Sequence, residues 1–369
     1  MVEQNHPPLA GSDDLQQLVV QITTVSEEVG PVRLMEVCGT HTVSLFRSGI
    51  RSILPANIRL ISGPGCPVCV TSQGYIDAAL DLARYSRVAI TTYGDMVRVP
   101  GRDGSLADLR AQGADVTVCY SARDAVQHAV ANPEREVVFL AVGFETTAPA
   151  TAVAVLEAEQ LGLQNFSLLT GHKLVMPALN ALLAADDLPV DGFLLPGHVS
   201  VIIGSDVYLP LAREHGKACV VAGFEVRQLL LGILHLLRQK AAGQPRVDNV
   251  YPVAVQPEGN RRAQELLEHV FQPGDAVWRA MGNIPGSGLD LRPALARFDA
   301  WQRYDMEPGE DYEPPGCRCG EVIQGRVDPG DCPLFATACR PESPIGPCMV
   351  SSEGSCAAWY RYARRTAQG

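Results

Sequence analysis

The stretch VRLMEVCGTHT, residues 32–42, joins a short apolar run to a loop of small and reactive residues. Residues 32–37 are mostly aliphatic, which is typical of a buried β-strand. Cys38 follows at once, and a Gly-Thr-His turn leads into the next segment. The same succession of run and loop recurs along the chain, so this stretch decides how the whole sequence is interpreted.

Eight further runs of this kind follow, and amphipathic segments such as 75–85, 147–163 and 225–240 separate them. The runs cover residues 58–62, 88–92, 115–119, 136–142, 166–170, 192–195, 218–222 and 250–255. Apolar strands that alternate with helices predict parallel sheets with helices on their faces. Nine strands are many for one sheet, so we expect an α/β protein with two Rossmann-like units.

A division into segments follows from these patterns. We expect a flexible polar tail over residues 1–12, a first unit over 13–132 and a second unit over 133–255, with a break near Ala131-Asn132-Pro133. Residues 256–369 form a C-terminal region. Within it, periodicity disappears from about residue 305 to 369, where Pro, Gly and Cys are frequent, so apolar burial alone does not account for its folding.

Composition excludes several classes of protein. The 369 residues are 46% hydrophobic and 19% charged, which argues against disorder. The net charge of −11 disfavours nucleic acid as a partner, because phosphates attract clustered Lys and Arg. The N-terminal residues lack a secretory signal, and the longest apolar stretch, 229–237, is too short to span a membrane. We therefore expect a cytoplasmic protein.

Polar side chains follow the ends of several predicted strands. In doubly wound sheets these ends form the ligand crevice. Each such residue is individually more typical of a cap or a loop hydrogen bond, but together they predict the lining of the crevice: Glu145, Thr146, Thr147, His172, Lys173, His198 and Glu225. The tripeptide Gly-Phe-Glu occurs after two strands, at Gly143 and Gly223, which hints at a duplication. Neither G-x-G-x-x-G nor a P-loop motif is present.

Eleven cysteines are unusual in a reducing compartment, and six of them lie near the C-terminus with the pattern C-x-C-x12-C-x6-C-x8-C-x7-C. The six are Cys317, Cys319, Cys332, Cys339, Cys348 and Cys356. No C-x2-4-C pair of the kind found in zinc sites occurs among them. Irregular spacing favours a [4Fe–4S] cluster. A zinc site and redox disulfides without a metal remain alternatives.

Three more cysteines lie in loops. Cys66 and Cys69 form a C-P-V-C motif at a strand-to-helix turn, which suits a redox dithiol or two soft metal ligands. Cys38 and His41 suit a nucleophile and base or a ligand pair. If the two loops end on one sheet, Cys38, Cys66 and Cys69 converge on a thiolate site for iron. The following helix should favour the Cys38 thiolate.

Cys119 and Cys219 differ from the loop cysteines because both lie in apolar runs. A free cysteine in such a run behaves as a small hydrophobic residue. We expect a structural role for both.

Long motifs in this sequence resemble those of the HypD family of hydrogenase maturation proteins. They are MEVCGTHT (35–42), GPGCPVC (63–69), TYGDM (92–96), GFETTAP (143–149), GHVSVIIG (197–204), CRCGEV (317–322), DCPLF (331–335) and GPCMVSSEG (346–354). One local difference is Val226, where the family would have proline after Gly-Phe-Glu.

This resemblance implies two Rossmann-like units that flank a cleft and a C-terminal [4Fe–4S] segment. It implies a maturation scaffold with redox activity, on which the Fe(CN)2CO group of [NiFe] hydrogenase is built, rather than a conventional turnover enzyme. The implied partners are a HypC-like chaperone and HypE, which receives thiocyanate from HypF and supplies cyanide.

The resemblance also implies roles for individual residues. Cys38 is the expected iron ligand, with His41 close by, and Cys66 and Cys69 form a redox or ligand pair. The expected cluster ligands are Cys317, Cys332, Cys339 and Cys356, with Cys319 and Cys348 as an accessory pair. An alternative function is an iron–sulfur-dependent thiol–disulfide oxidoreductase that acts on a protein substrate.

Overall fold

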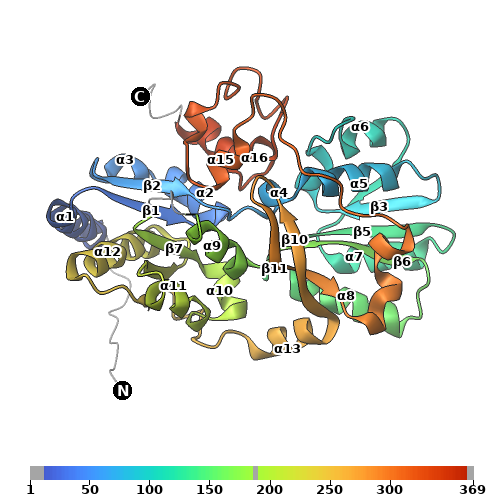
Figure 1. Ribbon diagram of the computed structural model, residues 1–369, viewed down its shortest axis with the longest axis horizontal. Coiled ribbons are helices and arrows are strands. Elements are labelled where there is room, and N and C mark those ends of the chain that lie inside the picture. Colours follow the sequence, from blue (N-terminus) through green and yellow to red (C-terminus); the bar gives the residue numbers. More distant parts are fainter. Residues whose placement is uncertain (1–11, 186–189, 364–369) are drawn as a thin grey trace.

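The computed structural model describes residues 12–185 and 190–363, and its strands form two parallel sheets and an antiparallel hairpin (Figure 1). The larger sheet has the order β2-β1-β7-β8-β9, and the smaller sheet has the order β4-β3-β5-β6. Helices cover the sheets, so the expected α/β fold with two Rossmann-like units is confirmed. The predicted tail over residues 1–12 lies outside the described residues except for Ser12, where the first helix begins.

The strand bounds agree closely with the apolar runs. The larger sheet contains β1 (Val32–Glu36), β2 (Ile58–Ser62), β7 (Gly192–Pro196), β8 (Ala218–Ala222) and β9 (Val247–Asn249). The smaller sheet contains β3 (Val88–Thr92), β4 (Asp115–Val118), β5 (Glu136–Gly143) and β6 (Phe166–His172).

The prediction for the last parallel strand is wrong. Pairing with β8 involves Val247 to Asn249, whereas residues 250–255 form turns. Pro252 has no N–H to donate to a neighbouring strand. The side chain of Asn249 also accepts from the N–H of Tyr251 and donates to the carbonyl of Val255, which closes the turn.

The predicted boundary at residue 132 is also wrong. The chain forms β1 and β2 of the larger sheet, then all four strands of the smaller sheet, and then returns with β7. Residue 132 lies between β4 and β5, which belong to the same sheet. Segments 13–132 and 133–255 therefore each contribute strands to both sheets.

Each sheet has a position where the strand order reverses. β1 has β2 on one side and β7 on the other, and β3 has β4 on one side and β5 on the other. When the strands of each sheet are numbered in chain order, the smaller sheet has the order 2-1-3-4 and the larger sheet has the order 2-1-3-4-5. The two Gly-Phe-Glu tripeptides follow the third strand of one unit and the fourth of the other, so they do not mark equivalent positions of this shared order.

The alternating side chains of β5 show how helices cover both faces of a strand. Phe139 and Ala141 belong to a buried cluster with α7 (Ala122–Ala131) and α8 (Ala148–Gln160). Val138 and Leu140 face the opposite cluster, which includes α5 (Gln73–Ala83) and α6 (Leu106–Ala111). Successive side chains point to opposite faces of a strand, so a continuous apolar run fits burial on both.

Helices cover the other strands in the same way. On one face of the larger sheet lie α1 (Ser12–Val29), α2 (Gly39–Arg47), α3 (Ile50–Ile53) and α12 (Val226–Ala242). A cluster shared by both sheets includes α4 (Pro67–Val70), α5 (Gln73–Ala83), α6 (Leu106–Ala111), α9 (Val175–Leu183), α10 (Gly197–Ile203) and α11 (Leu209–Arg213). The two units therefore share one core.

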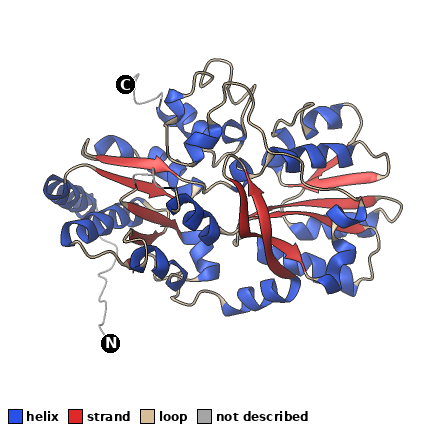
Figure 2. Cartoon of the chain, viewed as in Figure 1, coloured by secondary structure: helices blue, strands red, loops and turns tan. Residues whose placement is uncertain are grey.

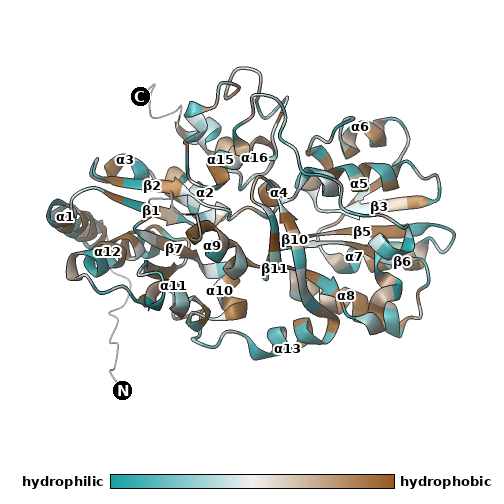
Figure 3. Ribbon diagram, viewed as in Figure 1, coloured by the Kyte–Doolittle hydropathy of each residue, from teal (hydrophilic) through white to brown (hydrophobic). Residues whose placement is uncertain are grey.

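The remaining short elements connect these layers. They are η1 (Gly94–Arg98), η2 (Asp206–Tyr208), η3 (Pro293–Phe298), α13 (Arg261–Val270) and α14 (Ala300–Arg303). Figure 3 shows α13 as mostly hydrophilic and β5 as mostly hydrophobic, in keeping with their outer and inner positions. No helix in the described part of the chain is long and apolar enough to cross a membrane.

A hairpin that the sequence patterns do not indicate lies between the two units (Figure 2). It consists of β10 (Phe271–Trp278) and β11 (Gly282–Leu291). Trp278 is fully buried and stacks on Phe144 at 6.1 Å between ring centroids. Pro273 and several glycines interrupt the apolar alternation that would reveal these strands.

The C-terminal segment is irregular, as expected. It contains only short helices, namely α15 (Cys319–Ile323), η4 (Pro329–Asp331), α16 (Pro347–Val350), α17 (Ser355–Ala358) and the π-helical turn η5 (Trp359–Ala363). Figure 1 shows the segment in orange-red above α4, between the two sheets.

Candidate functional site

A cavity of about 450 Å³ lies where the reversal points of the two sheets face each other. Cys38 and His198 line it from the ends of β1 and β7, while Tyr93 and Thr147 line it from the loops after β3 and β5. Ligands of open α/β sheets bind at such reversal points. The predicted crevice is therefore present, and strand ends from both units form it. We call it the site cavity.

Cys38 caps the N-terminus of α2 and is 8% exposed. Burial raises the pKa of its thiol to about 11, and the Glu353 carboxylate adds to this rise. Hydrogen bonds from the backbone N–H groups of His41 and Thr40 lower the pKa of Cys38 but do not offset the effect of burial. The start of the helix thus favours the thiolate, as expected, but in the protein alone the desolvation of the charged form outweighs this contribution.

Cys66 and Cys69 form a disulfide at the N-terminus of α4. Their loop contacts that of Cys38, since the N–H of Gly39 donates to the carbonyl of Gly65 at 3.1 Å. This contact follows from the parallel pairing of β1 with β2, whose carboxyl ends carry the two loops. The expected convergence of the loops that carry Cys38, Cys66 and Cys69 is present in the fold.

His41 lies in the first turn of α2 and is fully buried. Its Nε2 lies 3.2 Å from the carbonyl oxygen of Ala222 and 3.0 Å from that of Gly223. Carbonyl oxygens only accept, so Nε2 carries the proton. Burial lowers the pKa of His41 to about 4. Its ring therefore links α2 to the end of β8 as a neutral donor, rather than pairing with the Cys38 sulfur.

The other predicted lining residues separate into three groups. Thr146, Thr147 and His198 line the site cavity. Glu225 instead caps α12 in a capping box with Gln228, which is the ordinary role of such a residue.

Glu145, His172 and Lys173 are buried beside the site cavity rather than in its wall. Glu145 accepts from the N–H of Val175 at 2.9 Å, and burial raises its pKa to about 7. His172 Nε2 lies 3.0 Å from the Thr151 hydroxyl, and burial lowers the pKa of His172 to about 4. Burial lowers the pKa of Lys173 to about 8.

Three residues that sequence reasoning missed complete the wall of the site cavity. Ser351, Ser352 and Glu353 come from the C-terminal segment. Thr40 donates to Glu353 at 2.6 Å, and Asp95, after β3, accepts from the N–H of Ser352 at 2.9 Å. These three residues belong to the motif at 346–354, but there only the cysteine drew attention.

The six C-terminal cysteines line one second cavity, together with Leu334, Phe335 and Met349. We call it the six-cysteine site. Cys319 contacts Cys317 and Cys348, and Cys348 also contacts Cys356. Hydrogen bonds from Cys317 and Cys348 lower the pKa of Cys319. The expected accessory pair, Cys319 and Cys348, is therefore in mutual contact. Within the described residues, no three His, Cys, Asp or Glu side chains are arranged around a single metal position.

The six-cysteine site adjoins the disulfide. Helix α4, which contains Cys69, packs against α15 and α16, which contain Cys319 and Cys348. Cys66, Cys69, Cys319 and Cys348 all belong to one buried cluster. The disulfide thus lies between the site cavity and the six-cysteine site.

Cys119 and Cys219 lie apart from these sites. Cys219 is fully buried within β8, and Cys119 is 4% exposed directly after β4. Burial raises the pKa of Cys119 to about 11 and that of Cys219 to about 12. Neither lines the site cavity or the six-cysteine site, which agrees with a structural role.

Comparison with known proteins gives a consistent result. The sequence-family model HypD, described as "Hydrogenase formation hypA family", matches residues 13–363 of this chain. The hydrogenase maturation factor HypD of Azotobacter vinelandii is 46% identical over 357 residues, which cover 95% of this chain and 94% of that protein. HypD of Escherichia coli K12 is 44% identical over 339 residues, 92% and 91% of the two chains. The hydrogenase expression/formation protein HupD of Azotobacter chroococcum mcd 1 is 46% identical over 357 residues, 95% and 94%. With this similarity over nearly its whole length, the chain belongs to the HypD family of hydrogenase maturation factors.

Proposed function

We propose that this protein is the scaffold on which the iron of [NiFe] hydrogenase receives its cyanide and carbonyl ligands. The iron is cargo, and Cys38 is its first ligand, with Cys66 and Cys69 as a redox or second ligand pair. The observation that carries this proposal is the site cavity, which places Cys38 where the reversal points of two sheets meet. Thiolates are soft ligands that suit low-valent iron.

The buried state of Cys38 fits a ligand that loses its proton only when metal binds. A thiol with a pKa of about 11 stays protonated near neutral pH. A bound cation reverses this preference, because a coordinating thiol is deprotonated outright. His41 stabilises the loop by donating to the carbonyls of Ala222 and Gly223.

The six-cysteine site is proposed to bind a [4Fe–4S] cluster. The donor set fits, because six thiols line one cavity whose other walls are mainly apolar. Cys317, Cys332, Cys339 and Cys356 are the proposed ligands, and Cys319 and Cys348 the accessory pair. When bound, such a cluster supplies single electrons close to α4.

The dithiol gives the chain a balanced route to cyanide. Cys66 and Cys69 as thiols supply two electrons and two protons. With a protein-bound thiocyanate, R–S–CN, they yield the Cys66–Cys69 disulfide, R–SH and HCN. The S–S bond forms, the S–CN bond breaks, and the disulfide must then be reduced again by two electrons. Its place between the site cavity and the six-cysteine site supports this role.

The proposed partners are a HypC-like chaperone, which would dock at the opening of the site cavity near Cys38, and HypE, which HypF loads with thiocyanate. The proposed location is the cytoplasm. Crosslinks that placed the chaperone at the amino ends of the strands would contradict this docking position.

A second candidate is an iron–sulfur-dependent thiol–disulfide oxidoreductase. The observation that favours it is the disulfide of α4, which packs against the six-cysteine site. A reductase of this kind reduces a disulfide of a protein substrate and needs no additional iron.

Metal analysis and infrared spectroscopy of protein purified anaerobically with its chaperone test both candidates. The scaffold should contain about four sulfides and about five irons per chain, with cyanide and carbonyl bands in the infrared spectrum. Four irons without these bands would favour the oxidoreductase. Stoichiometric zinc without sulfide would exclude the cluster.

A further inference from the structure

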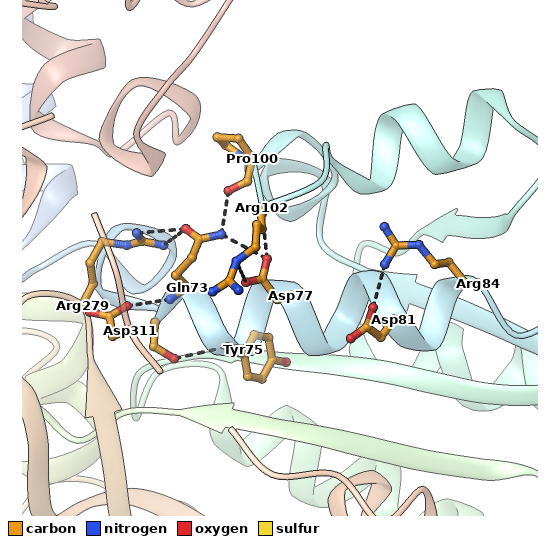
Figure 4. Close-up of polar contacts among 10 residues, drawn as sticks. Gln73, Tyr75, Asp77, Asp81, Arg84, Pro100, Arg102, Arg279 and Asp311 are labelled. Carbon is orange, nitrogen blue, oxygen red and sulfur yellow. Dashed lines mark hydrogen bonds and ion pairs between the residues drawn. The ribbon is translucent and has the colours of Figure 1, made fainter. Parts of the chain in front are cut away.

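Arg279 lies in the turn of the β10–β11 hairpin with its side chain 1% exposed (Figure 4). Its Nε donates to the carbonyl of Thr71 at 3.1 Å, and both terminal nitrogens donate to Gln73 Oε1 at 3.2 and 3.1 Å. Its own N–H donates to the carbonyl of Val70 at 2.9 Å. Arg279 therefore contacts the chain directly after the disulfide helix α4.

These contacts do not use the positive charge. A backbone carbonyl and an amide oxygen are neutral acceptors, and a neutral donor would serve them. Within residues 12–185 and 190–363, the guanidinium has no carboxylate at ion-pair distance. Asp311 is near, but its oxygens accept from the N–H groups of Gln73 and Ala280 at 2.7 and 2.9 Å. A buried cation is costly unless anions lie close to it, and arginine cannot lose its proton.

The six-cysteine site lies next to this cation. A Cβ on Gly320 would lie 2.1 Å from Cβ of Ala280, so the residue after Cys319 touches the residue after Arg279. Gln324 also donates to the carbonyl of Ala280 at 2.8 Å. Helix α15 is thus attached to the hairpin turn that contains Arg279.

One carboxylate also lies at the start of this helix. Glu313 Oε1 accepts from the N–H of Gly320, the residue after Cys319, at 2.6 Å. The start of α15 therefore lies near both a buried positive charge and an exposed negative charge.

We propose that Arg279 sets the reduction potential of the centre bound by the six cysteines, through a permanent positive charge at the junction of α4 and α15. This inference rests on the proposed function, since it requires the cluster. Reduction adds one electron to a centre already surrounded by thiolates, so a nearby cation favours the reduced state and a nearby anion disfavours it. Arg279 is a positioning residue and not a ligand.

Redox titration of the intact, anaerobically purified protein with dithionite, followed by electron paramagnetic resonance, tests the proposal. Arg279→Gln should lower the equilibrium constant for reduction about tenfold, which is 59 mV for a one-electron couple. Arg279→Lys keeps the charge and should stay within about threefold of wild type. Glu313→Gln should shift the constant in the opposite direction. Glu310→Gln, at an exposed site of the same segment, is the matched control.

The outcomes separate the two proposals. Equal shifts of the reduction equilibrium in Arg279→Gln and Arg279→Lys would show that Arg279 has only a structural role. An unchanged reduction equilibrium in Arg279→Gln protein with an intact cluster would overturn this inference but not the proposed function. If Arg279→Gln does not fold, the sign of the Glu313→Gln shift decides, and a shift toward lower potential overturns it. Wild-type protein without sulfide would overturn the proposed function and this inference together.

Discussion

Cys38 combines deep burial with a position in the wall of the site cavity. A residue needed only for packing would not require a cavity beside it, and an exposed nucleophile would not be this strongly desolvated. The combination is that of a ligand whose proton leaves when a cation arrives.

Cys38→Ser should abolish binding of the non-cluster iron and hydrogenase maturation, because a hard, protonated hydroxyl replaces a soft ligand. The circular dichroism spectrum and the sulfide content should stay unchanged. Infrared spectra and a maturation assay measure the loss. Cys119→Ser is the control: burial of a hydroxyl costs about 1–3 kcal/mol of stability, but maturation should continue. If Cys38→Ser protein matured hydrogenase at the wild-type rate, Cys38 would not be an essential ligand, and Cys66 and Cys69 would hold the iron instead.

His172 should make stability depend on pH. Its pKa is lowered from 6.5 to about 4 by burial, so between these values the unfolded chain binds a proton that the folded chain does not. The free energy of unfolding therefore decreases as the pH falls from about 6.5 to 4, by roughly 3 kcal/mol from this residue. His172→Gln keeps a donor toward Thr151 and removes the titration.

Denaturant unfolding of both proteins across this pH range measures the difference. Glu145, whose pKa is raised to about 7, contributes with the opposite sign in both proteins and cancels from the comparison. Parallel pH profiles for wild type and His172→Gln would contradict the prediction.

At the scale of elements, the two cysteine loops depend on close backbone contact. A Cβ on Gly65 would lie 2.3 Å from the backbone nitrogen of Cys38. Only glycine permits this approach, so the loop before α4 and the start of α2 are positioned against each other by their main chains.

Gly65→Ala should therefore separate the two loops. We expect a loss of about 1–3 kcal/mol in the free energy of unfolding, as for other overpacked sites, together with loss of the non-cluster iron. Gly330→Ala is a matched control, since a Cβ there meets nothing within 4 Å, and it should change stability by less than about 0.5 kcal/mol. Similar effects of both substitutions would contradict this role of the contact.

The elements also show what the sequence can reveal. Apolar runs such as 88–92 and 218–222 predicted strands correctly because both faces of each strand are buried. The pairing of β1 with β7 could not be predicted, since it joins distant segments and has no local signal. The hairpin was missed because its glycines and prolines interrupt the pattern of a strand.

In the site, too, the sequence revealed some features and not others. Cys38, Cys66 and Cys69 were found because a reactive residue after a strand is a local signal. The orientation of His41 toward Ala222 depends on packing of α2 against β8, which spacing does not contain. Ser351 to Glu353 contact the cavity only because the C-terminal segment folds back over both units.

For the whole molecule, the C-terminal segment connects the two units. Thr40 of the larger-sheet unit donates to Glu353, while Asp95 of the other unit accepts from both Ser351 and Ser352. The wall of the site cavity is thus tied to each unit by hydrogen bonds to a carboxylate, which are stronger than neutral ones.

Asp95→Ala should release this wall from one unit. Amide exchange in residues 350–354 should become at least about tenfold faster, since loss of bonds to a charged group costs more than about 1.4 kcal/mol. Hydrogen exchange with mass spectrometry measures the change. Asp103→Ala, at an exposed position, should leave exchange in this segment unaltered. Equal protection in both variants would show that the serines do not depend on Asp95.

The interleaved strand order has a consequence for synthesis on the ribosome. The four strands of the smaller sheet are consecutive in the chain, so they can pair with one another as soon as β6 emerges. β1 and β2 are made first, yet β1 lacks its second neighbour until β7 appears at Gly192. Domains form as their residues become available, and early strands with unpaired edges are prone to aggregate. The nascent first strands are therefore the part of this protein that most needs protection by a chaperone.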